Sequence, residues 1–173
     1  MTRQILVLCE NGLNRDGNVL RQVLDPRPVR VLPCLGETLD ARAARLVQRN
    51  AAPLASSRPK PVLVVHRDAD ESTVSERRRQ IDAWLSEHDL GRLVHAVVPC
   101  IPDPCIERWL CAGARLKVRA EETIRPCEPW KKCWEKAPGP EWRRLEAAVL
   151  QLLEHPAPKD FAEFLESVKR IPE

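Results

Sequence analysis

Four short apolar runs, separated by segments with helical periodicity, constrain the fold of this chain more than any other feature of its sequence. Each run is short enough for a single buried strand, and the runs cover residues 4–9, 29–32, 62–65 and 93–98. The segments between them place apolar residues three and four positions apart, which is typical of amphipathic helices. This alternation predicts an α/β fold with a mostly parallel central sheet of about four strands, flanked by helices.

After the fourth apolar run, prolines, cysteines and tryptophans become frequent, and helical periodicity returns over residues 141–154 and 159–169. We therefore divide the chain into an α/β core over residues 1–112 and a segment over 113–173, whose C-terminal helices pack on the core. A loop is expected over residues 51–61, where prolines and serines gather.

Composition excludes several classes of protein. With 173 residues, 43% of them hydrophobic and 31% charged, the chain can bury a core and is not disordered. A net charge of +3 is too small to argue for nucleic-acid binding by itself. The apolar runs are far shorter than the roughly 18 residues of a membrane-spanning helix, and the N-terminal run is too short for a signal peptide. These features predict a cytoplasmic protein without a membrane partner.

Seven cysteines raise the question of disulfides or a metal. Without an export signal, reduced thiols are the better expectation. Five of them are separated by four, five, fifteen and five residues: Cys100, Cys105, Cys111, Cys127 and Cys133. Structural zinc sites usually pair cysteines roughly two to four residues apart. We therefore expect scattered buried thiols and keep structural zinc as the alternative.

Acidic residues follow the expected strands. Glu10 follows the first apolar run, Asp68 and Asp70 the third, and Glu107 the fourth. Ligands of open parallel sheets gather at the carboxyl ends of the strands, and carboxylates that converge there repel one another unless a cation lies between them. Magnesium binds through one or two carboxylates together with water and substrate phosphate. The pattern predicts a metal site for phosphate chemistry.

The same residues also have structural interpretations. Glu10 suits the first turn of a helix, where the helix dipole favours acids. Asp68 and Asp70 can cap the next helix or pair with its arginines, and Glu107 can form a surface ion pair with its neighbour Arg108.

Other polar and aromatic positions have alternatives too. His66 is expected to be structural, with a proton shuttle as the alternative, and Trp109 is expected in the core. The stretch WKKCW, residues 130–134, suits single-stranded nucleic acid or a partner surface. We favour a proline-rich flap that packs its tryptophans onto the sheet.

These motifs resemble the Toprim domain. The stretches VLCENG and VVHRDAD match its glutamate after the first strand and its Asp-x-Asp after the third. The stretch PCIERWL, residues 104–110, is similar to a Pro-Cys-Phe-Glu-x-Trp-Leu type signature of small stand-alone Toprim proteins. These are the RloB-like and DUF4276-like groups, which are related to the OLD-family nucleases. The resemblance covers residues 4–112, and the three motifs in this order are more specific than the Asp-x-Asp alone.

The resemblance implies a Toprim-like Rossmannoid core and a nuclease that uses Mg²⁺ or Mn²⁺ to cleave DNA or RNA. Many such proteins are encoded beside an ATPase of the AAA or ABC type and act in defence against phage. By this resemblance Glu10, Asp68 and Asp70 are metal ligands and catalytic residues, and Glu107 is a further catalytic residue. Asp16 matches a second acid that often follows the first.

The chain departs from the family pattern at two places. Glycine usually follows the glutamate directly, whereas Asn11 precedes Gly12 here, and Glu71 stands where a glycine usually follows the Asp-x-Asp. A glycine there permits a tight turn and a close approach to phosphate. Two other functions therefore stay open: a non-catalytic interaction or regulatory subunit, and a different hydrolase or phosphotransfer reaction on a nucleotide.

Overall fold

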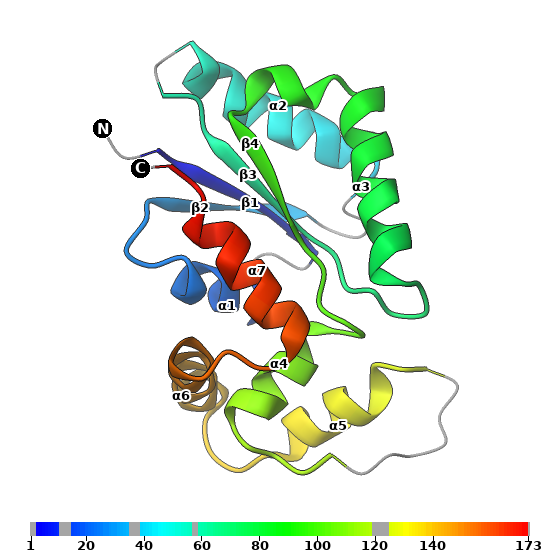
Figure 1. Cartoon of the computed structure of the whole chain (residues 1–173), viewed down its shortest axis with the longest axis vertical. Helices are drawn as coiled ribbons and strands as arrows, with labels where there is room; N and C mark the ends of the chain where they lie inside the picture. The colour runs from blue at the N-terminus through cyan, green and yellow to red at the C-terminus, as the bar shows by residue number, and fades with distance from the viewer. Residues whose placement is uncertain (1–2, 11–14, 35–38, 57–58, 119–124, 173) are drawn as a thin grey trace.

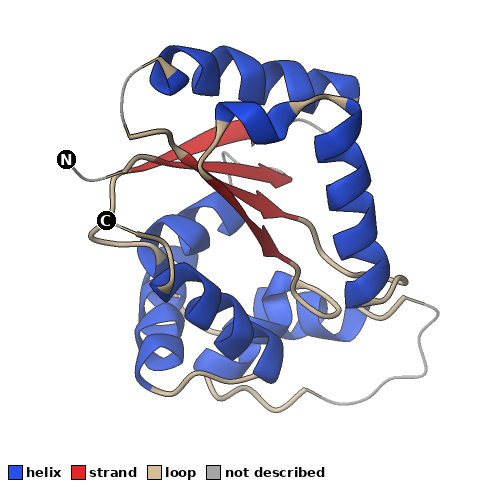
Figure 2. Ribbon diagram, turned by 45° about the horizontal axis from the view of Figure 1, so that its top comes forward, coloured by secondary structure: helices blue, strands red, loops and turns tan. Residues whose placement is uncertain are grey.

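In a computed structural model, which describes residues 3–10, 15–34, 39–56, 59–118 and 125–172, the four expected strands pair in one sheet. They are β1 (Ile5–Glu10), β2 (Val29–Cys34), β3 (Val62–His66) and β4 (Ala96–Cys100). The order is β2-β1-β3-β4, and every pairing is parallel. Figure 2 shows helices on both sides of this sheet. The predicted α/β class and parallel four-stranded sheet are confirmed, in a Rossmannoid arrangement.

Seven α-helices and one short 3₁₀ helix accompany the sheet in the described ranges. They are α1 (Arg15–Val23), α2 (Ala41–Ala55), α3 (Val74–Glu87), the 3₁₀ helix η1 (Leu90–Leu93), α4 (Ile106–Gly113), α5 (Glu128–Lys136), α6 (Glu141–Glu154) and α7 (Lys159–Lys169). The bounds of α6 and α7 confirm the two helices expected near the C-terminus. The helix α4 was not expected from the sequence, although Ile106, Trp109 and Leu110 have helical spacing. It is only eight residues long and lies in a stretch rich in proline and cysteine.

Successive residues of a strand point to opposite faces of the sheet, and two hydrophobic cores result. Ile5, Val7 and Cys9 of β1 lie in a core shared with α1, α4, α6 and α7. Leu6 and Leu8 lie in a second core shared with α2 and α3. Figure 1 shows these two groups of helices on opposite sides of the sheet. Because both faces are covered, the central strands β1 and β3 read as almost unbroken apolar runs.

The expected loop over residues 51–61 is wrong in its first half, because α2 continues through Pro53 to Ala55. Proline lacks the N–H that a helix interior needs. Here it stands in the last turn, and the buried Ala51 holds that turn against the second core. Tertiary packing therefore outweighs the local signal of the proline.

The N-terminal cap of α3 is Thr73. The Thr73 hydroxyl accepts a hydrogen bond from the Glu76 N–H at 3.1 Å, and the Glu76 carboxylate accepts one from the Thr73 N–H at 2.7 Å. This reciprocal pair is a capping box. The hydrogen bonds from Thr73 lower the pKa of Glu76.

The C-terminal helices share the first core with the strands. Phe161 and Phe164 of α7 contact Trp109 of α4, with ring centroids 5.0 and 5.8 Å apart. Trp109 is fully buried, and its indole N–H donates to Asp160 at 2.6 Å. It is therefore a core residue on which no base can stack. Among the described helices, none is long and apolar enough to cross a membrane.

Gly113 allows α4 and α6 to approach each other closely. A Cβ atom at this position would overlap the carbonyl oxygen of Ala148 and lie 2.9 Å from Cγ of Leu152. Both neighbours belong to α6, so the clash would involve backbone that cannot turn away.

We expect Gly113→Ala to lower the free energy of unfolding by about 1–3 kcal/mol, as overpacked cores do. Gly91→Ala is the matched control, because nothing lies within 4 Å of its added Cβ. Urea denaturation of both variants checks the prediction, and equal stabilities would contradict the close α4–α6 contact.

Candidate functional site

The carboxyl ends of β1 and β3 meet where the strand order of the sheet reverses. β1 lies between β2 and β3, and the crevice at such a reversal is the usual ligand site of open α/β sheets. The register pairs Leu8 of β1 with Val65 of β3. The next residues along the two strands, Cys9 and His66, therefore lie side by side at this edge.

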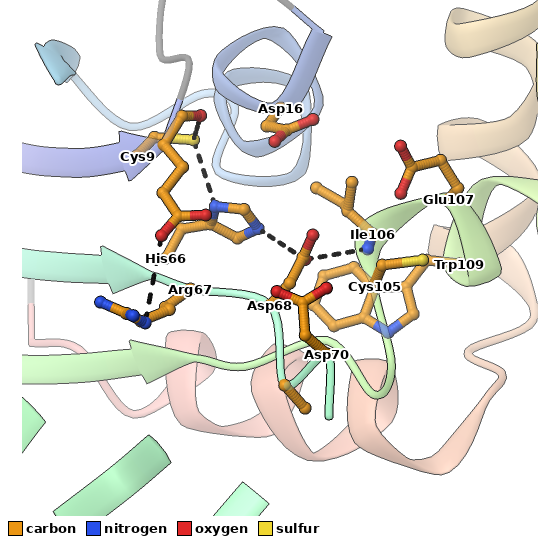
Figure 3. A network of polar contacts seen from close by, with 12 residues as sticks. Cys9, Asp16, His66, Arg67, Asp68, Asp70, Cys105, Ile106, Glu107 and Trp109 are labelled. Atoms are coloured by element: carbon orange, nitrogen blue, oxygen red, sulfur yellow. Dashed lines mark hydrogen bonds and ion pairs between the residues drawn. The ribbon is translucent and has the colours of Figure 1, made fainter. Parts of the chain in front are cut away.

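Polar contacts run outward from Cys9 (Figure 3). The Sγ atom of Cys9 lies 3.3 Å from Nδ1 of His66, and Nε2 of His66 lies 3.4 Å from Oδ1 of Asp68. The same Asp68 oxygen accepts a hydrogen bond from the Ile106 N–H, the first of α4, at 3.1 Å. Burial by itself lowers the pKa of His66, but Cys9 and Asp68 raise that pKa well above its usual value. His66 is fully buried and connects β1 with the residues after β3.

The charged residues after β3 are held by the segment after β4. The Arg67 N–H donates to the carbonyl oxygen of Cys100, the last residue of β4, at 3.0 Å. The N–H groups of Ala69 and Asp70 donate to the carbonyl oxygens of Pro102 and Pro104 at 2.9 and 2.8 Å. These bonds continue the β3–β4 pairing past the ends of both strands. Asp70 adopts a left-handed backbone, with φ of 52°, which an aspartate tolerates better than most residues. The Asp-x-Asp is therefore fixed at the sheet edge by backbone hydrogen bonds.

Glu10 is the last residue of β1, whereas the sequence predicted it directly after the end of the strand. Its carboxylate lies 4.0 Å from Nε of Arg67. Burial raises the pKa of Glu10, His66 and Arg67 oppose that effect, and Asp68 and Asp70 add to it. The three predicted ligands Glu10, Asp68 and Asp70 are thus close enough to repel one another. Asn11 and Gly12, where the family pattern is altered, lie outside the described residues.

Asp16 joins the same edge from the first turn of α1. Burial raises the pKa of its carboxyl, and Asp68 raises it further against the opposing effects of His66 and Arg15. The sequence marks Asp16 only through its match to a second family acid. Its position beside His66 depends on how α1 crosses back over the sheet.

The two aspartates of the Asp-x-Asp already accept internal hydrogen bonds. Asp68 caps α4 through Ile106, as described above, and Oδ1 of Asp70 accepts a bond from the Cys127 thiol at 2.9 Å. Asp68 therefore caps a helix, as one interpretation of the sequence predicted, but the helix is α4 and not α3. Among the described residues, the ligand atoms of Glu10, Asp68 and Asp70 do not all lie within 4.8 Å of one another, whereas those of Cys9, Asp16 and His66 do.

Glu107 is buried and forms an ion pair with Arg15. Arg15 also lies 3.6 Å from Asp16 and 3.7 Å from Glu141. The guanidinium therefore links α1, α4 and α6, and it shields Glu107 from the other acids. The predicted surface ion pair between Glu107 and Arg108 is wrong, because Glu107 is buried and pairs with Arg15. Arg108 instead lies 3.9 Å from Asp160.

An open cleft of about 1010 Å³ borders the acidic edge. It is lined by the loop after β3 with the first turn of α3, and by α5 with the residues just before it. Asp70 lies on the loop. Four cations line it: Arg77, Arg125, Lys131 and Lys132. Four carboxylates line it as well, so the cleft is not strongly basic, but it offers cations beside Asp70 for an anionic ligand.

The segment expected to be a proline-rich flap is the helix α5. Its proline lies in the first turn, where a missing N–H costs nothing. Trp134 is fully buried and Trp130 is half-buried against the first core, as the packing interpretation predicts. Arg144 lies 5.1 Å from the Trp134 ring.

All seven cysteines are free, and six are buried. Cys105 lies close enough to Cys127, and Cys111 to Cys133, for each pair of thiols to interact. Burial and the Cys133 thiol raise the pKa of Cys111 to about 12. These four cysteines form two separate pairs, and in the described part of the chain they form no cluster of three ligands.

The chain matches no protein-family model, no curated protein and no solved structure. The resemblance to Toprim proteins therefore stays a prediction from three motifs. The chemistry of the site itself has to indicate a function.

Removing the Arg15 side chain should lower the free energy of unfolding more than neutralising Glu107, its buried partner. Arg15→Ala leaves Glu107 charged and buried, which costs about 3 kcal/mol in comparable sites. Glu107→Gln leaves no buried charge and should cost less. Urea denaturation of both variants measures the difference, and the reverse order would show that the ion pair does not support the fold.

The metal-free protein should lose stability as Asp16 ionises. Because the folded pKa of Asp16 lies above its unfolded value, its contribution is fully present at acid pH and is lost as the pH rises through the folded pKa. In EDTA, Asp16→Asn should therefore be more stable than the wild type at pH 7.5, by on the order of 1 kcal/mol. The difference in stability between Asp16→Asn and the wild type should become smaller as the pH is lowered toward 4.5.

Urea denaturation at the two pH values measures this change. Asp82→Asn, on the exposed face of α3, is the control and should show no such dependence. An Asp16→Asn difference that does not vary with pH would contradict the raised pKa.

Proposed function

We propose that this chain is a divalent-metal-dependent nuclease that hydrolyses phosphodiester bonds of DNA or RNA in the cytoplasm. The observation that carries the proposal is the gathering of Glu10, Asp16, Asp68 and Asp70 at the reversal point of the sheet, next to an open cleft. Burial and mutual repulsion make ionised carboxylates unfavourable there. A bound cation would remove that cost.

The donor set suits a hard cation. Glu10, Asp68 and Asp70 would hold Mg²⁺ or Mn²⁺, which take carboxylate and water oxygens as ligands. The internal contacts of Asp68 and Asp70 use the Oδ1 atom of each side chain, and metal binding would use the other oxygen. When bound, such an ion supplies Lewis acidity and lowers the pKa of a coordinated water.

The cleft supports a substrate with phosphate groups. Lys131 and Lys132 of α5 line the same cleft as Arg77 and Asp70. With a divalent ion at Asp70, the balance of four cations and four carboxylates would become positive. Backbone phosphates of a nucleic acid would then lie between α5 and the metal, where lysine and arginine hold them.

We further propose that the protein acts with a partner ATPase of the AAA or ABC type in defence against phage, as its motifs imply. Trp142 and Leu150 of α6 are 63% and 56% exposed. Large exposed apolar side chains are typical of surfaces that bind other proteins, and α6 is the first surface on which to test such a contact.

A non-catalytic interaction subunit is the second candidate. The observation that favours it is the use of Asp68 to cap α4 and of Asp70 to bind the Cys127 thiol. In that case the carboxylates stabilise the loop and need no ion. The two functions differ in whether the protein binds a divalent cation.

Calorimetric titration with Mn²⁺ separates the two candidates. We expect saturable binding to the wild type, loss of binding in an Asp68→Asn/Asp70→Asn double variant, and wild-type binding in Asp82→Asn. The asparagines keep an acceptor for Ile106 and Cys127, so the loop should stay folded. Nuclease activity on plasmid, single-stranded DNA and tRNA should fall by about 100-fold or more in the double variant.

A folded wild-type protein that binds no Mn²⁺ would overturn the nuclease proposal and support the interaction subunit. Binding that survives the double substitution would place the ion elsewhere. The substrate that is cut identifies DNA or RNA as the target.

A further inference from the structure

The structure brings three chemically different ligands together on the α1 side of the sheet edge. They are the thiol of Cys9 on β1, the carboxylate of Asp16 on α1 and the imidazole of His66 on β3. Their ligand atoms all lie within 4.8 Å of one another, and all three residues are buried. Figure 3 shows Asp16 above the pair formed by Cys9 and His66.

The spacing of the thiol and the imidazole is already close to that of two ligands on one ion. The Sγ atom of Cys9 lies 3.3 Å from Nδ1 of His66. Bonds of about 2.3 Å to sulfur and 2.0–2.1 Å to nitrogen at a tetrahedral ion place these two atoms about 3.5 Å apart. A small adjustment of either side chain would therefore accommodate a metal.

The second nitrogen of His66 has the surroundings of a metal-binding histidine. Nε2 lies 3.4 Å from Oδ1 of Asp68, and among the described residues it has no well-formed hydrogen bond. Histidines that bind a metal through one nitrogen usually direct the other toward a carboxylate, which orients the ring and makes it a better ligand. Asp68 is held in that position by the Ile106 N–H.

We propose that Cys9, Asp16 and His66 form a binding site for a borderline-soft transition-metal ion of the Zn²⁺ class. Thiolate and imidazole select such an ion over Mg²⁺, which prefers oxygen ligands. Binding requires the thiolate of Cys9 and the neutral imidazole of His66, so the protons held by these two groups are released to solvent. The thiolate and the Asp16 carboxylate then balance the charge of a divalent ion. Asp68 is a positioning residue that acts through His66.

The three ligands of this site differ from those of the hard-ion site, but Asp68 belongs to both because it also contacts His66. The proposal does not depend on the nuclease function. Three protein ligands leave a fourth position for water, as in catalytic zinc sites. The Asp16 side chain is 13% exposed, while Cys9 and His66 are fully buried. An ion would therefore enter past Asp16.

Co²⁺ is the probe, because a thiolate ligand produces a charge-transfer band in the near ultraviolet that oxygen ligands do not. We expect the wild-type protein to bind one Co²⁺ with this band and to release it to Zn²⁺. Cys9→Ser should lose the band. Cys34→Ser, which changes another buried thiol at a strand end, and Asp70→Asn, which changes the hard-ion site, should both retain it.

Two further variants keep the test decisive if Cys9→Ser does not fold. Asp16→Asn should weaken Co²⁺ binding while the thiolate band remains at saturation, and Asp68→Asn should lower the affinity by about 10–100-fold. Absence of the band in the wild type, its persistence in folded Cys9→Ser, or an unchanged affinity in Asp16→Asn would overturn the proposal. A normal cobalt spectrum in a protein that cuts no nucleic acid would leave this site standing and refute only the nuclease.

Discussion

The parallel pairing of β1 with β3 is the constraint on which the rest of the site depends. Its register places Leu8 opposite Val65, and therefore Cys9 beside His66, with both side chains on the α1 face. A shift of one residue would turn each side chain to the other face. It would then bury Glu10 and Arg67 among the apolar residues under α1. The apolar residues of β1 and β3 oppose such a shift, because they are buried in the two cores on opposite faces of the sheet.

The sheet edge carries more buried polar groups than stability alone would favour. Asp16, His66, Asp68 and Glu107 are all buried, and buried charges are stable only when they are paired or bound to an ion. Arg15 satisfies Glu107, and the Ile106 N–H satisfies one oxygen of Asp68. Burial raises the pKa of Glu10 and of Asp16, so ionised carboxylates at this edge cost stability. Acids with perturbed pKa values are typical of functional sites.

Local patterns predicted the elements well where the pattern was strong and unopposed. The strands and the helices α6 and α7 follow from apolar spacing. The end of α2 does not, because the packing of Ala51 overrides the proline signal. The start of α3 has a local cause as well, because Thr73 stands three residues before Glu76 and the two form a capping box. The pairing of Glu107 with Arg15 joins residues 92 positions apart, and no local rule contains it.

The sequence by itself determined which residues end the strands, and hence that Glu10, Asp68 and Asp70 lie at one edge of an α/β sheet. Only the tertiary structure decided which of them share a face and which meet. Strand order and register brought Cys9 to His66, and the crossing of α1 brought Asp16 to both. The residues after β4 then engaged Asp68 and Asp70 as acceptors. The physical reason is that acid content and strand ends are local properties, whereas metal-ligand geometry depends on contacts between segments far apart in the chain.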